Sequence, residues 1–504
     1  MLTQEDYSDL QKNKKDLEII QRQFACIMHD SPCFSIYKPA TLGDGIYYFP
    51  KEEQEYFRQL FDESFTGITA TKFIPASGIA SRMFSVLRDF LHSFNPQHDD
   101  LDLFLEDENN KEFRHFVNQI ERFSFYDLIQ SKIEKKGNTH KNKAQFIIEF
   151  IQILLDDPEV GMEGKAKAIL PLFSDSKGGV ISAFELQIIE ALKLFPNRSK
   201  TKVHFTIDAD QFNSFQKLEH SLFERLSTVD QERLQVEYSF QDSNTDSIAL
   251  LYNDHYLRDE NEKLVFRKSG HGALFQNIKR FRDDFIFIKS IDSIWPEDQQ
   301  SIAIQKSIAG LYWERFNQIK DLLDLLKDHY ETAIPDALTF IKIHFHIDLR
   351  ESFLEIDFEE QTKQLIDFLN RPFRVCGMVK NEGKPGGGPF WIEREEKISL
   401  QIVESSELES SQGALNDAIF FNPVNMVCGM KNFEGKPWDL DQFKDFMRVI
   451  ISKKTQFEMD IRTFEYPGLW NGSMGYWNSI FVEIPTQTFR SLKTINDCLD
   501  QKKE

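Results

Sequence analysis

The chain has few cysteines, and their spacing argues against two kinds of protein. Only 5 cysteines occur in 504 residues, and no two of them have the Cys-x-x-Cys spacing. An odd, scattered set of cysteines is typical of thiols in a reducing compartment, not of a disulfide framework or a zinc site. We therefore expect a cytoplasmic protein.

Positive charge is also scarce. The sequence has 60 Lys and Arg against 81 Asp and Glu, which gives a formal net charge of −21. Proteins that bind nucleic acids in general, or anionic membranes, need a basic surface. We therefore expect neither partner, although a small basic pocket for phosphate groups is compatible with this charge.

Long hydrophobic runs are absent as well. The longest apolar stretch, residues 146–155, contains Glu149 and Gln152 and is too short to span a bilayer. Residues 1–20 have no apolar signal core. The composition, with 41% hydrophobic and 28% charged residues, is that of a soluble globular protein long enough to bury a large core.

The spacing of apolar residues predicts an α/β protein. Residues 1–70 and 84–160 have helical spacing, whereas strand-like and helix-like segments alternate over residues 165–295. Such alternation favours a mixed, mainly parallel sheet flanked by helices. In the last part of the chain, strand-like runs cover residues 373–380, 398–404, 424–431 and 477–484. We predict an N-terminal helical region over residues 1–70, a core over 71–380 with a helical insertion over 84–160, and a strand-rich C-terminal part over 381–504.

A loop of small residues follows the first predicted strand of the core. The strand ends at Pro75, and a helix begins after Arg82. Small side chains let a backbone approach a ligand, exposed N–H groups at a helix start suit a phosphate, and Arg82 could add a charge-assisted contact. The same residues also fit a tight turn with a surface arginine. The binding candidates in this loop are Ala76, Ser77, Gly78 and Ser81.

Three charged residues stand at the ends of other predicted elements. Asp292 follows a strand whose sequence predicts full burial, and ligands collect at the carboxyl ends of such strands. A carboxylate there can hold Mg²⁺ together with substrate phosphates. Lys167 precedes an apolar run and Lys493 lies near a helix start, so both are candidates for binding phosphate. Solvated lysines and an aspartate that caps a helix are the alternatives.

A second loop suited to close backbone approach is the segment Gly270, His271 and Gly272. His271 has glycine on both sides, so its neighbours supply no packing, but it also fits a simple turn. Residues 381–391 are rich in glycine and predict a hairpin loop that could act as a lid.

Two further patterns suggest metal sites. Asp208 and Asp210 form the Asp-x-Asp pattern with which GT-A glycosyltransferases usually hold a metal. His344 and His346 lie in a segment whose pattern predicts a strand, where alternate side chains share a face. Two histidines are fewer than the three or more ligands that a metal site needs, so packing is the preferred interpretation of that pair.

Taken in order, these segments resemble the UDP-N-acetylhexosamine and UDP-sugar pyrophosphorylases, which are nucleotidyltransferases with a GT-A-like Rossmannoid core. Residues 76–83 look like their A-G-G-x-G-T-R-L loop. Lys167 looks like the lysine of their Pro-Lys-Gly motif, and residues 270–275 are similar to their G-N-G-G-L-Y loop. Residues 288–294 resemble their V-D-N-I strand end, which puts Asp292 on the metal-binding aspartate.

Two more motifs and the whole chain extend the resemblance. Residues 401–408, which include Glu404, resemble V-V-E-Y-S-E-I, and residues 489–494, which include Lys493, resemble F-S-P-L-K-N. The whole chain also looks like a bacterial family filed as domain of unknown function 4301. The resemblance implies a nucleoside triphosphate and a sugar phosphate as substrates and Mg²⁺ as cofactor. It assigns catalysis to Arg82, Lys167 and Lys493, and the metal to Asp292. It assigns substrate binding to Ala76, Ser77, Gly78, Ser81, Gly270, His271, Gly272 and Glu404.

The sequence departs from these motifs at several positions. Ser77, Ala80 and Ser81 replace Gly, Gly and Thr of the first loop, and His271 replaces the Asn of the second. Two other functions therefore stay open: a GT-A glycosyltransferase that consumes a nucleotide sugar, and a non-catalytic nucleotide- or sugar-binding protein of the same fold.

Overall fold

The computed structural model describes the chain apart from residues 1, 30–33, 66, 138–141, 176, 197, 297, 329, 354–355, 384–386, 396, 409–417, 490–491 and 500–504. The chain divides into two compact units. The first unit comprises residues 1–73, 239–289 and 303–486. The second unit comprises residues 74–238, 290–302 and 487–504.

A mixed β-sheet forms the centre of the first unit. Its strands are β2 (Thr41–Leu42), β3 (Gly45–Tyr47), β19 (Asn478–Glu483), β12 (Phe373–Lys380), β16 (Asn425–Gly429), β11 (Phe285–Lys289) and β4 (Ala70–Pro75), and β4 continues into the second unit. β11 pairs in parallel with β4 and β12 in parallel with β19, whereas both β11 and β12 are antiparallel to β16. The predicted mixed sheet is therefore confirmed. All five residues of β11 are buried, as its apolar sequence predicts.

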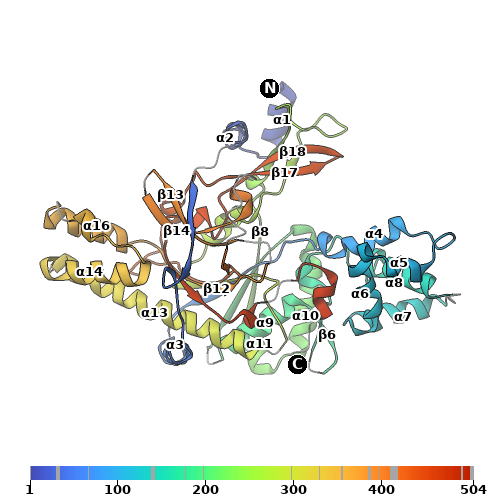
Figure 1. Cartoon of the computed structure of the whole chain (residues 1–504), viewed down its shortest axis with the longest axis horizontal. Coiled ribbons are helices and arrows are strands. Elements are labelled where there is room, and N and C mark those ends of the chain that lie inside the picture. Colours follow the sequence, from blue (N-terminus) through green and yellow to red (C-terminus); the bar gives the residue numbers. More distant parts are fainter. Residues whose placement is uncertain are drawn as a thin grey trace. The chain divides into compact units, whose positions relative to one another are not determined.

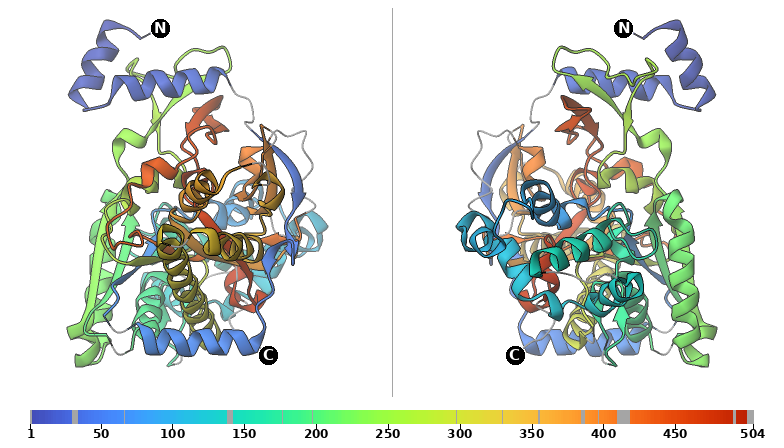
Figure 2. Two further views of the ribbon diagram at one scale, coloured as in Figure 1. Left: turned by 90° about the vertical axis from the view of Figure 1, so that its left-hand side faces the viewer. Right: turned by 90° about the vertical axis from the view of Figure 1, so that its right-hand side faces the viewer.

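Helices cover one face of this sheet. They are α3 (Lys51–Ser64), α13 (Gln299–Asp328), α14 (Tyr330–Phe345), α15 (Arg350–Phe353) and α16 (Phe358–Leu369), of which α14 and α16 lie side by side (Figures 1 and 2). The ring of Phe61 on α3 packs on Phe287 of β11, and Tyr312 on α13 stacks on Phe373 of β12. A Cβ at Gly310 of α13 would lie 1.9 Å from the carbonyl oxygen of Phe57, so this glycine permits close packing on α3.

The opposite face of the sheet packs on loops and short helices. Ile286, Ile288, Cys376 and Met426 point into a buried cluster on that side. The cluster also receives residues of η7 (His271–Leu274) and α12 (Phe275–Ile278). This packing anchors the predicted glycine loop, because η7 begins directly after Gly270.

Two smaller antiparallel sheets complete the first unit. One contains β10 (Phe266–Arg267), β9 (Ser247–Leu251), β18 (Met459–Glu465) and β17 (Ile450–Gln456), and the other contains β1 (Ser35–Pro39), β13 (Gly388–Arg394) and β14 (Lys397–Val403). The helices α1 (Gln4–Lys12) and α2 (Leu17–Met28) share a buried cluster with β9 and β18. Residues 1–70 thus contain the predicted helices, with β1, β2 and β3 between them.

The second unit has an α/β part and a helical part. In the α/β part, the end of β4 is followed in the sheet by β7 (Thr201–Ile207) and β8 (Leu234–Phe240). The helices here are α9 (Ala183–Leu194), α10 (Phe212–Arg225) and α11 (Thr228–Arg233). Phe184 of α9 and Phe215 of α10 pack with Phe205 of β7 in one buried cluster. β7, β8 and these helices lie where the alternating pattern predicted them.

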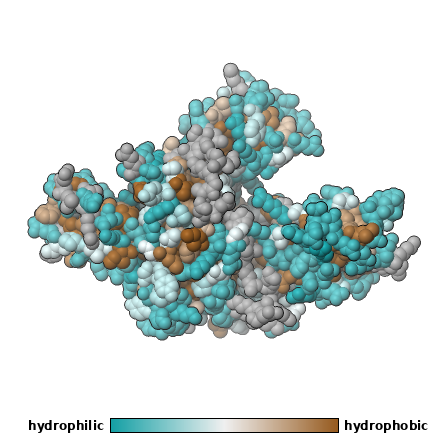
Figure 3. All heavy atoms as spheres, in the orientation of Figure 1, coloured by the Kyte–Doolittle hydropathy of each residue, from teal (hydrophilic) through white to brown (hydrophobic). Residues whose placement is uncertain are grey.

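The predicted helical insertion is confirmed. It contains α4 (Ser85–Ser93), α5 (Leu101–Glu106), α6 (Lys111–Asn118), α7 (Tyr126–Lys136) and α8 (Lys143–Asp156), and no described residue between 84 and 160 is in a strand. Stacked rings such as Phe90 on Phe113, with centroids 4.0 Å apart, fill its core. Its visible surface is mostly hydrophilic (Figure 3). Leu492, Ile495 and Cys498 from the end of the chain are buried in the same core.

The segment around His344 and His346 differs from its prediction. The predicted strand at His344 and His346 is wrong: His344 lies in α14, and His346 follows the helix with a φ of 59°. The apolar residues of this segment repeat at helical spacing because they pack against α16.

Among the described residues, no helix is long and apolar enough to cross a membrane.

Candidate active site

The loop after β4 is held by backbone hydrogen bonds within the second unit. The N–H of Ala76 donates to the carbonyl of Thr206 on β7 at 2.8 Å, and Ala76 is buried. Gly78 is exposed, and a Cβ built on it would meet no atom within 4 Å. Gly78 therefore leaves open space beside the loop, and its contact with a ligand stays a prediction.

Arg82 lies in a short 3₁₀ turn, η1 (Ser81–Phe84), that precedes α4. Its side chain is exposed and makes no ion pair or hydrogen bond with the residues that the structure describes. The position suits a contact with a ligand in solution. In this structure, Arg82 makes no ion pair or hydrogen bond with Asp292, whose cluster is described next. Ser81 contributes its backbone to the same turn.

Lys167 is tied to this loop through the backbone. Ala166 forms a β-bridge with Ile79, and the N–H of Lys167 donates to the carbonyl of Gly78 at 2.9 Å. Lys167 begins a 3₁₀ helix, η4 (Lys167–Ile169), so it does not precede a strand as its sequence suggested. The buried neighbours Ala166 and Ala168 hold the backbone in place on both sides of the lysine.

Lys167 and Asp292 form an ion pair. Nζ of Lys167 lies 3.1 Å from Oδ2 of Asp292, and the two side chains are 15% and 31% exposed. Nζ of Lys167 also donates to the carbonyl oxygen of Leu492. Two segments that are distant in sequence therefore meet at one ammonium group, which fixes its position.

Lys493 brings a second positive charge to Asp292. Its neighbour Leu492 is buried in the aromatic core of the helical insertion, and the N–H groups of Lys493 and Thr494 both donate to Oδ2 of Asp497 at 2.8 and 2.7 Å. The side chain of Lys493 is exposed. Burial raises the pKa of Asp292, and the charges of Lys167 and Lys493 oppose that rise.

We call Lys167, Asp292 and Lys493 the lysine–aspartate cluster. It brings two ammonium groups to one carboxylate in a chain with a net charge of −21. It lies next to the 76–82 loop because Gly78 and Ile79 bond to the backbone at Lys167 and Ala166. A partly exposed site of this kind attracts an anion such as a phosphate group.

The other predicted loop, in the first unit, forms a different cluster. Nε2 of His271 lies 3.3 Å from Oε2 of Glu404, and Oε1 of Glu404 accepts from Nε1 of Trp470 at 2.9 Å. The His271 ring stacks on the Trp470 ring with centroids 4.0 Å apart and an angle of 8°. The N–H of Leu469 donates to Nδ1 of His271 at 2.9 Å, which assigns the ring proton to Nε2. We call His271, Glu404 and Trp470 the histidine–glutamate cluster.

Glycines around His271 are required by packing. A Cβ at Gly270 would lie 2.1 Å from Oε2 of Glu465, and one at Gly272 would lie 2.4 Å from the carbonyl oxygens of Tyr466 and Pro467. Here the expectation of close backbone approach is correct, but the group that approaches is the protein's own chain.

Glu404 is held as a carboxylate. Burial acts to raise its pKa, but the hydrogen bonds that His271 and Trp470 donate, together with the charge of Arg448, lower it to about 2. Behind it, Glu407 and Arg448 form an ion pair at 2.7 Å with both side chains only 1% exposed. The sequence analysis did not identify Trp470, Glu407 or Arg448, because each contact joins residues far apart in the chain.

The remaining metal candidates are weak. Asp208 is buried whereas Asp210 is exposed, so the two carboxylates of the Asp-x-Asp pattern differ in their surroundings. Within the described part of the chain, no group of three or more His, Cys, Asp or Glu side chains could hold a metal ion. Part of the predicted lid, residues 384–386, lies outside the described residues.

Comparison with known proteins gives one family and several solved structures. Residues 3–504 match the family described as Domain of unknown function (DUF4301). No curated protein matches the chain. A uridine diphosphate N-acetylglucosamine pyrophosphorylase from Trypanosoma brucei is similar with a TM-score of 0.47 and 9% identity, over 96% of this chain and 74% of that one. A UDP-glucose phosphorylase from the same organism has a TM-score of 0.45 and 11% identity, over 98% and 76% of the two chains.

Proposed function

The chain belongs to the DUF4301 family, and we propose that it is a sugar-1-phosphate nucleotidyltransferase that uses a nucleoside triphosphate, with UTP the first candidate. The observation that carries the proposal is the lysine–aspartate cluster. Three residues chosen from separate motifs, Lys167, Asp292 and Lys493, meet around one carboxylate. The order of six motifs along the sequence supports the same function.

In the proposed reaction, a phosphate oxygen of the sugar 1-phosphate attacks the α-phosphorus of the nucleoside triphosphate. A new P–O bond forms, the bond between the α-phosphorus and the bridging oxygen breaks, and pyrophosphate leaves. Such a transfer depends mainly on positioning and on stabilising charge. No side chain needs to form a covalent bond to the substrate.

The residues of the cluster have separate parts in this scheme. Lys167 is fixed by Asp292 and by the carbonyl of Leu492, so it presents a charge at one place beside the 76–82 loop. Lys493 is exposed and can move to the reacting phosphates as charge develops on them. Arg82, exposed in the turn after the loop, would hold the triphosphate from the other end of the loop.

Whether the lysine–aspartate cluster can hold Mg²⁺ depends on a bound substrate that supplies further ligands. Among the described residues Asp292 is the one carboxylate of the cluster, and Mg²⁺ often binds through one or two carboxylates with waters and substrate phosphates. The donor set therefore fits an ion that arrives with the nucleotide. When bound, the ion would neutralise phosphate charge. For Asp292 to bind it, the ion pair with Lys167 has to loosen, and Lys167 would then turn to the phosphates.

We propose a binding role for the histidine–glutamate cluster as well, within the first unit. Glu404 is 23% exposed and ionised, so an oxygen of its carboxylate can accept a hydrogen bond from a hydroxyl or N–H group. The backbone of Gly270 and Gly272 positions His271 beside it. This role suits the sugar or the base, both of which carry such donors.

Release of pyrophosphate tests the proposal. The assay combines each of UTP, CTP, GTP and ATP with a panel of sugar 1-phosphates, with and without Mg²⁺. We expect pyrophosphate only when nucleotide, sugar phosphate and Mg²⁺ are all present. Nucleotide binding without pyrophosphate from any pair would favour the non-catalytic binding protein, and transfer of sugar from a nucleotide sugar would favour the glycosyltransferase.

A further inference from the structure

A cavity in the first unit is lined by a buried lysine to which the described residues supply no hydrogen bond or ion pair through Nζ. The cavity has a volume of about 240 Å³ and is lined by residues that include Arg22, Asp242, Gly272, Lys444, Phe446 and Tyr466. Lys444 is only 6% exposed, and its Nζ makes no hydrogen bond or ion pair with any residue that the structure describes. An isolated ammonium group in such a place is costly, because burial removes its water.

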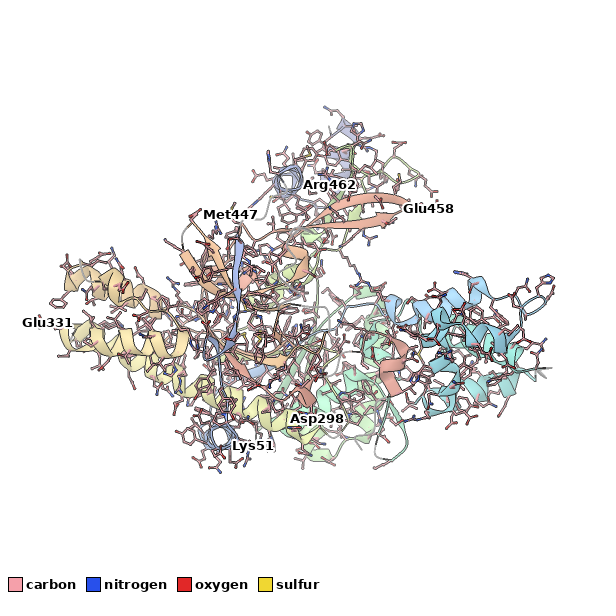
Figure 4. All side chains as sticks on the ribbon, viewed as in Figure 1. Lys51, Asp298, Glu331, Met447, Glu458 and Arg462 are labelled. Atoms are coloured by element: carbon pink, nitrogen blue, oxygen red, sulfur yellow. The ribbon has the colours of Figure 1, made fainter. Side chains whose placement is uncertain are left out.

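Three aromatic rings surround this ammonium group. Nζ of Lys444 lies 5.1 Å from the ring centroid of Phe275 and 5.2 Å from those of Phe446 and Tyr466. Cation–π contacts offset part of the cost of burial but supply no negative charge. Phe446 lies in the segment before β17, next to Met447, which marks this place in Figure 4.

The charges around the cavity leave an excess of one positive charge. Arg22 and Lys444 line it as cations, and Asp242 and Asp441 line it as anions. Lys279, which does not line the cavity, pairs with Asp441, so the lining cations Arg22 and Lys444 share the carboxylate of Asp242, and a ligand with a single negative charge would balance them.

We propose that this cavity binds a small carboxylic acid with an apolar or aromatic body, whose carboxylate pairs with Lys444. Apolar side chains such as Ile19, Val449 and Phe464 also line the cavity, together with polar ones such as Gln23 and Gln276. Its volume is below the roughly 300–1,000 Å³ of sites for drug-sized ligands, so the acid is small. No residue of the lysine–aspartate cluster lines the cavity, so this site does not depend on the proposed nucleotidyl transfer.

The charge state of Lys444 makes the binding depend on pH. Burial lowers the pKa of Lys444 to about 8; the nearby charges of Arg22 and Lys279 act in the same direction, and Asp441 opposes them. Asp242 and Tyr466 are the other titratable groups that line the cavity. A carboxylate binds the protonated lysine, so its affinity falls as the pH rises from 7 to 9.

The test uses benzoate, phenylacetate and hexanoate as probes, with benzyl alcohol and inorganic phosphate as comparisons. Binding is measured by calorimetry and by the rise in melting temperature of the full chain. We expect at least one carboxylate to bind, several-fold and at most about tenfold more tightly at pH 7 than at pH 9, because the protonated fraction of Lys444 falls by about that factor. In Lys444→Met its affinity should fall at least tenfold, whereas Lys436→Met, an exposed lysine paired with Glu434, should behave like the unchanged protein.

A second measurement needs no variant. Acetic anhydride modifies accessible amines, and peptide mass spectrometry reports Lys444 and Lys436 separately. The bound carboxylate should slow acetylation of Lys444 at least fivefold and leave that of Lys436 unchanged. The proposal is overturned if no carboxylate protects Lys444 at millimolar concentration. It is also overturned if benzyl alcohol or inorganic phosphate protects Lys444 equally well, or if a folded Lys444→Met binds the carboxylate with unchanged affinity.

Discussion

The two charged clusters of this protein differ in how fully their own chain satisfies them. In the histidine–glutamate cluster, both carboxylate oxygens of Glu404 have a donor, and the ring of His271 is fixed at both nitrogens and on one face. In the lysine–aspartate cluster, one carboxylate faces two ammonium groups, and burial favours its neutral form. The first cluster is therefore built as a rigid support. The second brings two ammonium groups together, as expected of a site that binds an anion.

The largest expected difference between the clusters concerns activity. Asp292→Asn should lower pyrophosphate formation by at least about 100-fold, which corresponds to roughly 2.7 kcal/mol of transition-state stabilisation. The free energy of unfolding should change by less than about 1 kcal/mol, because the folded state already disfavours the charged carboxylate. Rate assays and urea unfolding of the same sample measure both. Equal losses of activity and stability would assign Asp292 a structural role.

Replacing Glu404, unlike replacing Asp292, should lower the stability of the fold. Its pKa of about 2 lies below the ordinary value of 4.5, so its carboxylate stabilises the fold above pH 4.5, and this stabilisation is lost as the pH falls towards 2. Allowing for its partial exposure, Glu404→Gln should cost about 2 kcal/mol at pH 7. Urea unfolding at pH 7 and pH 3 should show the difference from the unchanged protein shrinking at the lower pH. A difference independent of pH would contradict the assignment.

Glycine substitutions sharpen the same comparison. Gly272→Ala should destabilise the protein by about 1–3 kcal/mol, because its Cβ would lie 2.4 Å from two carbonyl oxygens. Gly78→Ala should be neutral or raise stability by up to about 1 kcal/mol, since its Cβ meets open space. Melting temperatures of the two variants decide this. If Gly78→Ala leaves the fold intact but abolishes nucleotide binding, the loop approaches the ligand as its motif suggests.

The smallest expected effect belongs to Lys493. Its side chain is exposed, so Lys493→Met should lower kcat about tenfold and change KM little, because charge builds on the phosphates only in the transition state. Lys177, an exposed lysine of the same unit, provides the control as Lys177→Met. A variant Lys493→Met with unchanged kcat would remove this residue from the site.

Much of the fold could be predicted because local patterns agree with the tertiary structure. β7, β12 and β16 are mostly or wholly buried, so their apolar runs identify them. β17 and β18 were missed because they are half-exposed and carry residues such as Lys453, Lys454 and Asp460. The segment at His344 was assigned to the wrong type of element, because a short apolar run fits a strand as well as a helix.

The site residues likewise divide into those that the sequence pattern identifies and those that it does not. Lys167, Asp292 and Lys493 could be chosen from the sequence because each stands at the end of an element, and the order of the motifs suggested that they meet. The ion pair of Glu407 with Arg448 and the buried Lys444 could not, because their surroundings are made by segments distant in sequence. Spacing along the chain carries no signal for such contacts.

The most direct test of the central claim is the binding of UTP by variants of Lys167. UTP with Mg²⁺ stabilises only a protein that binds it, so the melting temperature reports binding without knowledge of the sugar. We expect a clear rise for the unchanged protein and for the surface control Lys177→Met, and less than a quarter of that rise for Lys167→Met. If Lys167→Met is folded and its melting temperature rises as much as that of the control, the lysine–aspartate cluster is not the nucleotide site.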